Sequence, residues 1–304
     1  MFALPSELST SVFAELPAEF RNHGRTADWF FGRGPNADSF LEGPAFDQMG
    51  NLWVCDIPFG RIFKIDRQGR FELAAEYDGE PNGLQFHRDG SLYITDHRRG
   101  LMRLDPATGK VETVLNRVRR EGFKGTNDLV FASNGDIYFT DQGQTGLQDP
   151  SGRVFRLNAA TGHTDMLVDC VPSPNGLVLT ADEKTLIVAA TRANQIWRLP
   201  LHPDGSTTKV SLFLQLQGGL TGPDGLAIDA EDNLAIAHCG LGTVWLFSRL
   251  GEPLYRIRSC RGLQTTNLCY GGEGGRSLFI TESETGTILK ADLPVAGQRL
   301  FSHA

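Results

Sequence analysis

EGPAFDQMGNLWVCD, residues 42–56, is the first of six copies of one pattern along this chain. The other five are NGLQFHRDGSLYITD (82–96), NDLVFASNGDIYFTD (127–141), NGLVLTADEKTLIVA (175–189), DGLAIDAEDNLAIAH (224–238) and NLCYGGEGGRSLFITE (267–282), and consecutive copies begin 40 to 49 residues apart. Each copy places two short apolar segments around a turn rich in Gly, Asp and Asn. A period of this length, without apolar residues spaced by three and four, is typical of a radial β repeat rather than a helical solenoid.

A second regular unit follows each copy, for example GRIFKIDRQG (60–69) and GLMRLDPATG (100–109). These units alternate apolar and polar residues and end in turn-forming residues, which predicts a third strand turning into a fourth. Six repeats of four strands predict an all-β fold, a six-bladed β-propeller with four strands per blade. An open β solenoid is the alternative, but it would need modified capping repeats at both ends. We also expect STSVFAEL (9–16) to form a strand that pairs with the last blade and fastens the ring.

Composition narrows the possible classes of protein. The length of 304 residues would allow two domains, but the unbroken repeat predicts one domain over residues 1–304. The 35 glycines fit the many tight turns of such a repeat, and the formal net charge of −7 disfavours a nucleic-acid partner. No apolar segment is long enough to span a membrane, and the first residues lack the basic and apolar regions of a signal peptide. The five cysteines show no CxxC spacing, which favours buried, reduced thiols and a cytoplasmic protein.

The first residue of each copy indicates where the chemistry lies. In a propeller these six anchor residues occupy equivalent points of six blades and should converge on one mouth of the central channel. Two carboxylates and four amides would form a ring of oxygen atoms, which suits a hard cation such as calcium. Asn-Gly and Asp-Gly are also common turn dipeptides, although a glutamate before Gly-Pro does not fit that alternative. The anchors are Glu42, Asn82, Asn127, Asn175, Asp224 and Asn267.

The end of the second strand in each copy should return to the same face of the ring. An offset of 14 residues from the anchors selects a second layer, which we expect to surround the mouth of the pocket. Such aspartates also commonly cap the loop that follows a strand. Within this layer His238 is a candidate proton carrier, with a purely structural role as the alternative. The layer consists of Asp56, Asp96, Asp141, His238 and Glu282.

Two basic clusters are predicted to open onto this face. Arg98 and Arg99 form one, and the other comprises Arg117, Arg119, Arg120 and Lys124. In an acidic protein they could attract a substrate that carries a carboxylate, or they could simply be solvated loop residues. The chain has no GxSxG, GxxxxGK or GxGxxG motif, so serine-hydrolase, nucleotide and nicotinamide chemistry find no support.

From about residue 40 to 294 the chain resembles the SMP-30/gluconolactonase family of six-bladed propeller hydrolases. The matching motifs are EGP at Glu42, ND at Asn127 followed by GDIYFTD, PNG at Asn175 and PDG at Asp224. The resemblance implies one divalent cation bound by these four residues. Calcium is the first expectation, with Mn²⁺, Mg²⁺ or Zn²⁺ as alternatives. Asn82 and Asn267 are then expected in the outer shell or facing the substrate.

The resemblance implies a metal-dependent lactonase in which Asp224 acts as general base or nucleophile. Phosphotriester hydrolysis at the same metal and a non-enzymatic small-molecule-binding propeller are the alternatives. Two departures concern the substrate. The sugar-lactone branch carries an arginine where this chain has Gly125, and the segment 21–38 has no counterpart and is a candidate lid over the channel.

Overall fold

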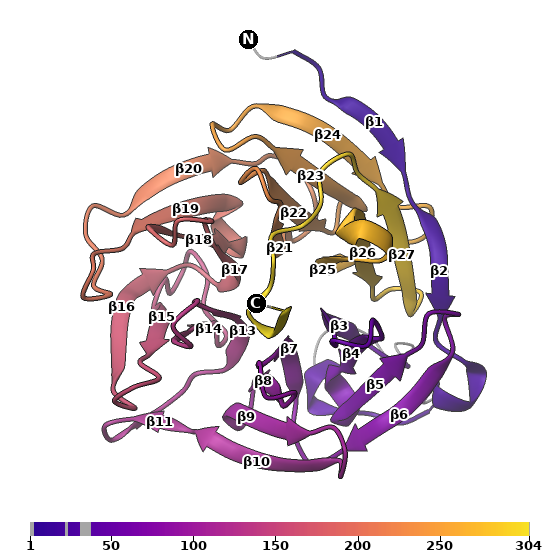
Figure 1. The fold of residues 1–304 in the computed structure, drawn as a ribbon, viewed down its shortest axis with the longest axis horizontal. Coiled ribbons are helices and arrows are strands. Elements are labelled where there is room, and N and C mark those ends of the chain that lie inside the picture. Colours follow the sequence, from indigo (N-terminus) through magenta and orange to yellow (C-terminus); the bar gives the residue numbers. More distant parts are fainter. Residues whose placement is uncertain (1–2, 22–23, 31–37, 304) are drawn as a thin grey trace.

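Six β-sheets stand side by side around a central axis, like the blades of a propeller (Figure 1). The computed structural model describes residues 3–21, 24–30 and 38–303. Within each blade the strands are antiparallel, and successive copies of the repeat form successive blades. The prediction of an all-β six-bladed propeller is therefore confirmed.

The first three blades each contain four consecutive strands. Blade one consists of β3 (Leu41–Phe46), β4 (Leu52–Asp56), β5 (Arg61–Ile65) and β6 (Phe71–Glu76). Blade two consists of β7 (Pro81–Phe86), β8 (Leu92–Asp96), β9 (Gly100–Asp105) and β10 (Lys110–Leu115). Blade three consists of β13 (Thr126–Phe131), β14 (Ile137–Asp141), β15 (Gly152–Leu157) and β16 (Thr164–Val171). A separate hairpin connects blades two and three and consists of β11 (Arg117–Val118) and β12 (Glu121–Gly122).

The last three blades follow the same order from the axis outward. Blade four consists of β17 (Pro174–Leu179), β18 (Thr185–Ala190), β19 (Gln195–Pro200) and β20 (Ser211–Gln215). Blade five contains β21 (Gly222–Ile228), β22 (Leu234–Cys239), β23 (Thr243–Phe247) and β24 (Pro253–Arg258). Blade six contains β25 (Thr265–Gly271), β26 (Ser277–Glu282) and β27 (Thr287–Asp292). Short 3-10 turns interrupt the connections at η1 (Ala18–Phe20), η2 (Asp28–Phe30), η3 (Ile57–Phe59), η4 (Thr191–Ala193), η5 (Glu273–Gly275) and η6 (Phe301–His303).

The N-terminal segment completes the ring. Strand β2 (Ser11–Glu15) pairs antiparallel with β27 and is the outer strand of blade six, so the predicted pairing with the last blade is confirmed. The expectation that residues 286–297 supply both a third and a fourth strand is wrong for this copy, because the N-terminus takes the fourth place. Strand β1 (Ser6–Ser9) continues onto blade five and pairs parallel with β24, which sequence analysis did not predict.

The hydrophobic core lies between neighbouring blades. One cluster joins blades one and two and includes Ile62, Leu92 and Ile94, all fully buried. Another joins blade six to blade one and includes Phe63 and Phe279. Because each blade buries both of its faces against its neighbours, the strands near the axis are apolar on both sides, as expected for a closed ring.

Leu16→Ala is expected to destabilise the protein by about 2–5 kcal/mol, because the Leu16 side chain is buried in the cluster that joins blades six and one. Its backbone N–H also donates to Gly286 O at 2.9 Å, which ties the N-terminal segment to the last blade. Leu4→Ala is the matched control, since Leu4 is 95% exposed and should change stability little. Urea unfolding of the two variants gives the comparison, and equal stabilities would contradict this role of the N-terminal segment.

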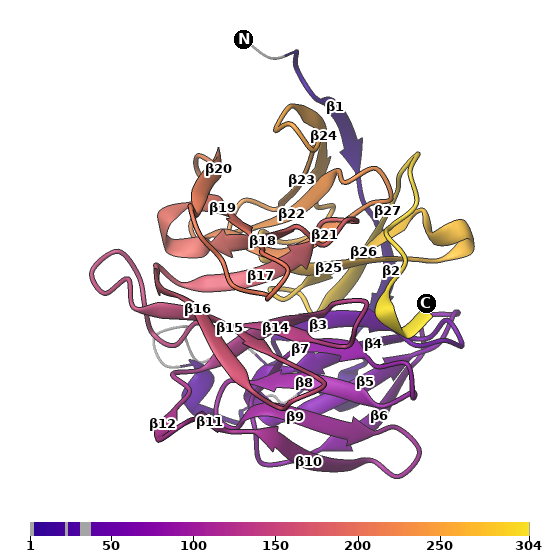
Figure 2. The ribbon, with the colours of Figure 1, turned by 60° about the vertical axis from the view of Figure 1, so that its left-hand side comes forward.

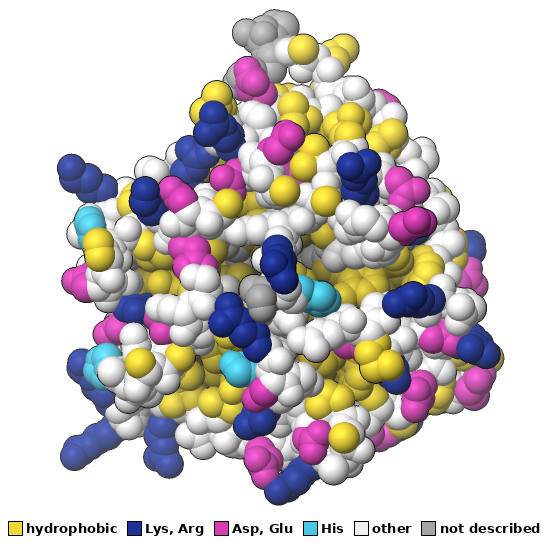
Figure 3. Space-filling model, viewed as in Figure 1, with side chains coloured by type: hydrophobic (Ala, Val, Ile, Leu, Met, Phe, Trp, Pro, Cys, Tyr) yellow, Lys and Arg dark blue, Asp and Glu magenta, His cyan; other side chains and the backbone are white. Residues whose placement is uncertain are grey.

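The two ends of the channel differ. The innermost strands begin at one end, and their apolar continuations, together with the C-terminal segment, line a smaller cavity of about 140 Å³ towards the other. Turn η6 covers this second end, where Phe301 stacks on Phe131 with ring centroids 4.9 Å apart. Figures 1 and 2 show the C-terminus reaching back over the ring, and Figure 3 shows hydrophobic side chains in the hollows beside it. No helix among the residues seen in the structure is long and apolar enough to cross a membrane.

Candidate functional site

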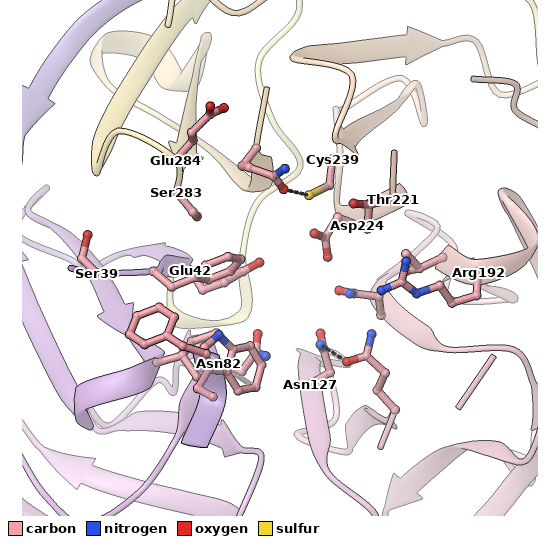
Figure 4. Close-up of a pocket in the computed structure, with 18 residues that line it drawn as sticks. Ser39, Glu42, Asn82, Asn127, Arg192, Thr221, Asp224, Cys239, Ser283 and Glu284 are labelled. Atoms are coloured by element: carbon pink, nitrogen blue, oxygen red, sulfur yellow. Dashed lines mark hydrogen bonds between the residues drawn. The ribbon is translucent and has the colours of Figure 1, made fainter. Parts of the chain in front are cut away.

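A cavity of about 540 Å³ opens at the end of the channel where the innermost strands begin. Its size lies within the range of about 300–1,000 Å³ that is usual for small-molecule sites. Figure 4 shows side chains from several blades pointing into it. Five of the six anchors line this cavity, as the repeat predicts: Glu42, Asn82, Asn127, Asn175 and Asp224.

The anchors belong to strands and not to turns, so the turn-dipeptide alternative is wrong. The glycines that follow them are needed because neighbouring strands approach closely near the axis. A Cβ on Gly43 would collide with Asn82 O, and Gly43 also has a φ of +57°. A Cβ on Gly225 would collide with the side chain of Asn267. Glycine at these positions lets each blade bring its anchor within reach of the next.

Hydrogen bonds between blades hold the backbone of the anchors in place. Thr95 Oγ1 of blade two donates to Asn127 O at 2.6 Å, and Thr140 Oγ1 of blade three donates to Asn175 O at 2.8 Å. In the same way, the Cys55 thiol of blade one donates to Asn82 O at 2.8 Å. This explains a buried polar residue one position before the end of the second strand in these copies.

Glu42 and Asp224 bring two carboxylates into the same buried space. Burial raises the pKa of Glu42 well above its ordinary value, and the negative charge of Asp224 raises it further. Hydrogen bonds from the Gly43 N–H and from Asn267 oppose this shift but do not cancel it. The two neighbouring carboxylates therefore carry an electrostatic cost, which a bound cation would relieve.

The amide oxygens of Asn127 and Asn175 complete the arrangement. Both Oδ1 atoms are buried, and neither has a hydrogen-bond partner among the described residues. For Asn127 the orientation is set by its neighbour, because Asn127 Nδ2 donates to Gln142 Oε1 at 3.0 Å, and Gln142 Nε2 donates to Ser173 Oγ at 2.9 Å. A buried carbonyl oxygen without a donor is costly unless something else satisfies it.

These observations fit a cation with oxygen ligands. Two carboxylates and two unsatisfied amide oxygens are the donor types that calcium and related hard ions prefer. No group of three or more His, Cys, Asp or Glu side chains in the described ranges is placed to hold a metal, so the donor set depends on the amides. The assignment of Glu42, Asn127, Asn175 and Asp224 as ligands stays a prediction, and the chemistry of these four residues supports it.

Asn267, the sixth anchor, lies deeper in the channel. It borders the smaller cavity instead of the large one and contacts both Glu42 and Asp128, donating to Asp128 Oδ2 at 3.4 Å. Burial raises the pKa of Asp128 to about 7. Asn267 therefore connects the pocket floor to a third buried carboxyl group, that of Asp128, which the repeat pattern did not single out.

The raised pKa of Glu42 predicts how the stability of the metal-free protein depends on pH. In the unfolded chain Glu42 loses its proton near its ordinary pKa, but the folded protein keeps that proton to a higher pH. Its contribution to stability is therefore complete below the ordinary value of 4.5 and is lost as the pH rises through the folded pKa. Glu42→Gln, which stays neutral, should gain about 1.4 kcal/mol over the wild type for each unit that separates the two pKa values.

Urea unfolding in a chelator at about pH 5 and about pH 8 measures this difference. The advantage of Glu42→Gln should be larger at the higher pH. A difference between variant and wild type that is the same at both pH values would show that Glu42 does not titrate as described.

The second layer predicted from the 14-residue offset does not face the pocket. Asp56 accepts from Phe40 N at 2.6 Å and pairs with Arg61, and Asp141 accepts from Gly125 N at 2.8 Å and pairs with Arg153. Asp96 and Glu282 likewise accept hydrogen bonds from the backbone of the loops that follow them. All four are fully buried, and the alternative of loop-capping carboxylates accounts for them.

The pocket is lined instead by the residue that directly follows the last residue of the second strand in a blade, or by the corresponding residue where the strand is longer. Successive residues of a strand point to opposite faces, so when the predicted residue turns away, its neighbour turns inward. The offset located the correct end of each second strand but the wrong face. The residues that line the cavity at this level are Ile57, Gln142, Thr191, Cys239 and Ser283.

His238 also lies behind the pocket wall. It is fully buried, its Nε2 lies 3.1 Å from Gly218 O, and its Nδ1 accepts from Trp245 Nε1 at 3.3 Å. Burial lowers its pKa. With both ring nitrogens engaged, the structural interpretation fits better than that of a proton carrier.

The basic clusters do not reach the cavity. Arg98 and Arg99 both pair with Asp78 at 2.8 Å, and Lys124 Nζ donates to Ser151 O at 2.8 Å. None of these side chains lines the large cavity. Their place on exposed loops fits the alternative of solvated loop residues.

The candidate lid contributes one wall of the cavity. Of segment 21–38, residues 22–23 and 31–37 lie outside the described residues, while Trp29 and Phe30 of η2 line the cavity beside Phe40 and Ile57. Trp29 packs edge-on against His97, with ring centroids 5.3 Å apart. The pocket thus has an aromatic side that the repeat pattern did not predict.

Gly125, the departure noted in the sequence, has a structural reason. Its φ is +152°, and a Cβ there would collide with the ring of His97. His97 occupies the space that a side chain at this position would need. The aromatic wall and the glycine are therefore two parts of one local arrangement.

Fold and pocket together define a class: six-bladed propellers with a polar, oxygen-rich pocket at the start of their innermost strands. The chain belongs to the SMP-30/Gluconolactonase/LRE-like family, whose sequence pattern matches residues 40–284. It is 33% identical over 273 residues to a gluconolactonase of Zymomonas mobilis, with 80% of this chain and 76% of that protein covered. It is 31% identical over 227 residues to lactonase drp35 of Staphylococcus haemolyticus, with 71% and 69% covered.

The fold also matches a solved structure, a calcium-binding protein, regucalcin, from Agrobacterium tumefaciens. The TM-score is 0.77 at 20% identity, and the alignment covers 99% of this chain and 100% of the other. At this level of identity the likeness concerns the fold. It supports the six-bladed ring over its whole circumference, including the N-terminal strands.

Proposed function

We propose that this protein is a metal-dependent hydrolase that opens the ring of a lactone. The observation that carries the proposal is the buried group of Glu42, Asp224 and the two unsatisfied oxygens of Asn127 and Asn175 at the floor of one open cavity. Relatives about 30% identical over most of the chain are a gluconolactonase and lactonases. Membership of the family makes a cyclic ester the first substrate class to test.

These four residues would hold a divalent cation. Calcium is the first candidate because all the donors are oxygens, with Mn²⁺, Mg²⁺ or Zn²⁺ as alternatives. When bound, such an ion supplies a Lewis acid for the ester carbonyl and for water. The carboxylate charges, which repel each other in the apoprotein, are then balanced.

Proton transfer and substrate binding would depend on the side chains of the cavity. Asp224 is the candidate general base, because it is the carboxylate that lies beside the polar side of the cavity, next to Cys239 and Thr221. The Cys239 thiol donates to Gln264 Oε1 at 3.0 Å, and its pKa is raised well above the ordinary value by burial and by the charge of Asp224, so it remains neutral. Asn82 offers an amide for the hydroxyl or ring oxygen of a substrate. The aromatic wall limits the access of water from the opposite side.

A proton-release assay with sugar, aliphatic and aryl lactones tests the proposal, with chelator and with each added metal. Hydrolysis that stops in chelator and returns with one ion is the expected result. A phosphotriester such as diethyl 4-nitrophenyl phosphate belongs in the same panel. Turnover of that compound without lactone turnover would replace the proposal by its enzymatic alternative, and binding of lactones without turnover would favour the non-enzymatic one.

A further inference from the structure

One positively charged side chain at the rim of the large cavity, that of Arg192, has no partner among the described residues. Arg192 is the only lysine or arginine among the described residues that line the cavity. Its side chain is exposed and makes no hydrogen bond or ion pair with any residue in the described ranges. Figure 4 shows it extending towards the pocket on the side of Asp224 and Asn127, across from Ser39 and Ser283.

The backbone that carries Arg192 is firmly held. It lies in η4, a single 3-10 turn directly after β18, and its N–H donates to Pro172 O at 3.3 Å. On one side of it, Thr191 Oγ1 donates to Pro223 O at 2.7 Å, and on the other, Asn194 Nδ2 donates to Gly218 O at 2.9 Å. The guanidinium group of Arg192 is therefore attached to a well-held backbone at the rim of the cavity.

Blade four differs from blades one and three at the strand end next to Arg192. At the end of the second strand, blade one has Asp56, which holds Arg61, and blade three has Asp141, which holds Arg153. The equivalent residue of blade four, paired with Pro174 as Asp56 is paired with Leu41, is Ala190. Gln195 stands opposite Ala190 where Arg61 stands opposite Asp56, so blade four has neither the acid nor the arginine of that pair. Arg192 lies outside the paired position, in the turn after the strand, and no carboxylate of this strand end holds its guanidinium.

We propose that Arg192 determines substrate specificity by binding an oxyanion, a carboxylate or phosphate, carried by the lactone. This rests on the proposed function and deepens it by naming the substrate class. A guanidinium offers two parallel N–H groups that match the oxygens of either anion. The other charged side chains among the described residues of the cavity, Glu42, Asp224 and Glu284, are carboxylates, so within this lining Arg192 is the one charged partner for an anionic substituent. The substrate would thus enter with its anionic end at this rim and its ester towards Asp224.

The test compares lactones that share a ring and differ in charge. D-Glucaro-1,4-lactone carries a carboxylate where D-glucono-1,4-lactone carries a hydroxymethyl group, and 6-phospho-D-glucono-1,5-lactone with D-glucono-1,5-lactone gives the same comparison for phosphate. In Arg192→Gln, kcat/KM for one of the anionic lactones should fall about tenfold to a hundredfold, mainly through KM, while the neutral lactones change less than about threefold. Arg192→Lys should restore part of the loss. Whichever anion shows the effect identifies the substituent.

Arg98→Gln is the matched control, because Arg98 is an exposed arginine that pairs with Asp78 away from the cavity. It should leave all four lactones unchanged. Equal losses for charged and neutral lactones in Arg192→Gln would overturn the proposal, as would no loss with any of them. A wild-type protein that opens none of the lactones would contradict the proposed function instead, and calorimetric binding of acyclic D-glucarate to wild type and Arg192→Gln would then still decide whether Arg192 forms an anion site.

Discussion

Asp224→Asn is expected to lower kcat for lactone opening by about 10²- to 10⁴-fold, the usual contribution of a general base. Asparagine keeps an oxygen ligand of similar size but cannot accept a proton at neutral pH. Part of the metal should therefore remain bound while turnover is lost. Initial rates at saturating metal, with the bound metal measured on the same samples, separate the two effects.

Glu284→Gln provides the control for this experiment. Glu284 also lines the cavity, but its carboxylate accepts from Leu263 N at 2.7 Å at the rim, so neutralising it should cost little activity. His238→Ala should likewise affect folding more than kcat, since the histidine lies behind the wall. Full turnover in metal-loaded Asp224→Asn would mean that another group takes the proton. Glu42 would then be the candidate, because Asp141 and His238 do not reach the pocket.

The double variant Glu42→Gln, Asp224→Asn is expected to lose the metal altogether. Both negative charges disappear from the donor set, and neutral amide oxygens alone bind hard cations weakly. A ligand present at a thousand times its Kd stabilises a folded protein by about 4 kcal/mol, and the wild type should show an increase in Tm of corresponding size when metal is added. The double variant should show none. Elemental analysis after dialysis gives a second, independent measurement.

The apo forms provide an internal check on folding. Removing two carboxylates that repel each other in a buried space should make the metal-free double variant at least as stable as the metal-free wild type at neutral pH. A missing metal response in a well-folded protein can then be attributed to the ligands. If the double variant retains stoichiometric metal, the ligand assignment is wrong, and a site elsewhere in the chain would have to be found.

The repeat allowed the ring and five pocket-facing anchors to be predicted because both depend on position within a blade. Equivalent residues of a propeller converge whatever their identity, so Glu42 and Asp224 could be placed together from spacing alone. The second layer was placed one residue too early, because the offset does not tell which of two adjacent side chains faces the axis. Asp141 and Gln142 illustrate this: the conspicuous acid holds a loop, and the less conspicuous amide orients Asn127.

Other parts of the site depend on contacts between segments that the repeat does not relate. The aromatic wall requires Trp29, from the segment before blade one, to meet His97, in the loop between β8 and β9 of blade two. Arg192 stands out only in the folded chain, as the one lysine or arginine among the described residues that line the cavity. Such features depend on which side chains the fold brings together, and the spacing of the repeat does not specify that.

The pairing of β2 with β27 delays the completion of the fold during synthesis on the ribosome. Ser11 pairs with Lys290, so blade six cannot be completed until the residues of all six blades have been synthesised. Until then β2 has no partner, and the blades already formed make an arc with two open ends. Closure of so large a loop is a late and slow event, since contacts distant in sequence form last. We expect truncated or stalled chains to expose sheet edges and to depend on chaperones, whereas the finished ring has joined them.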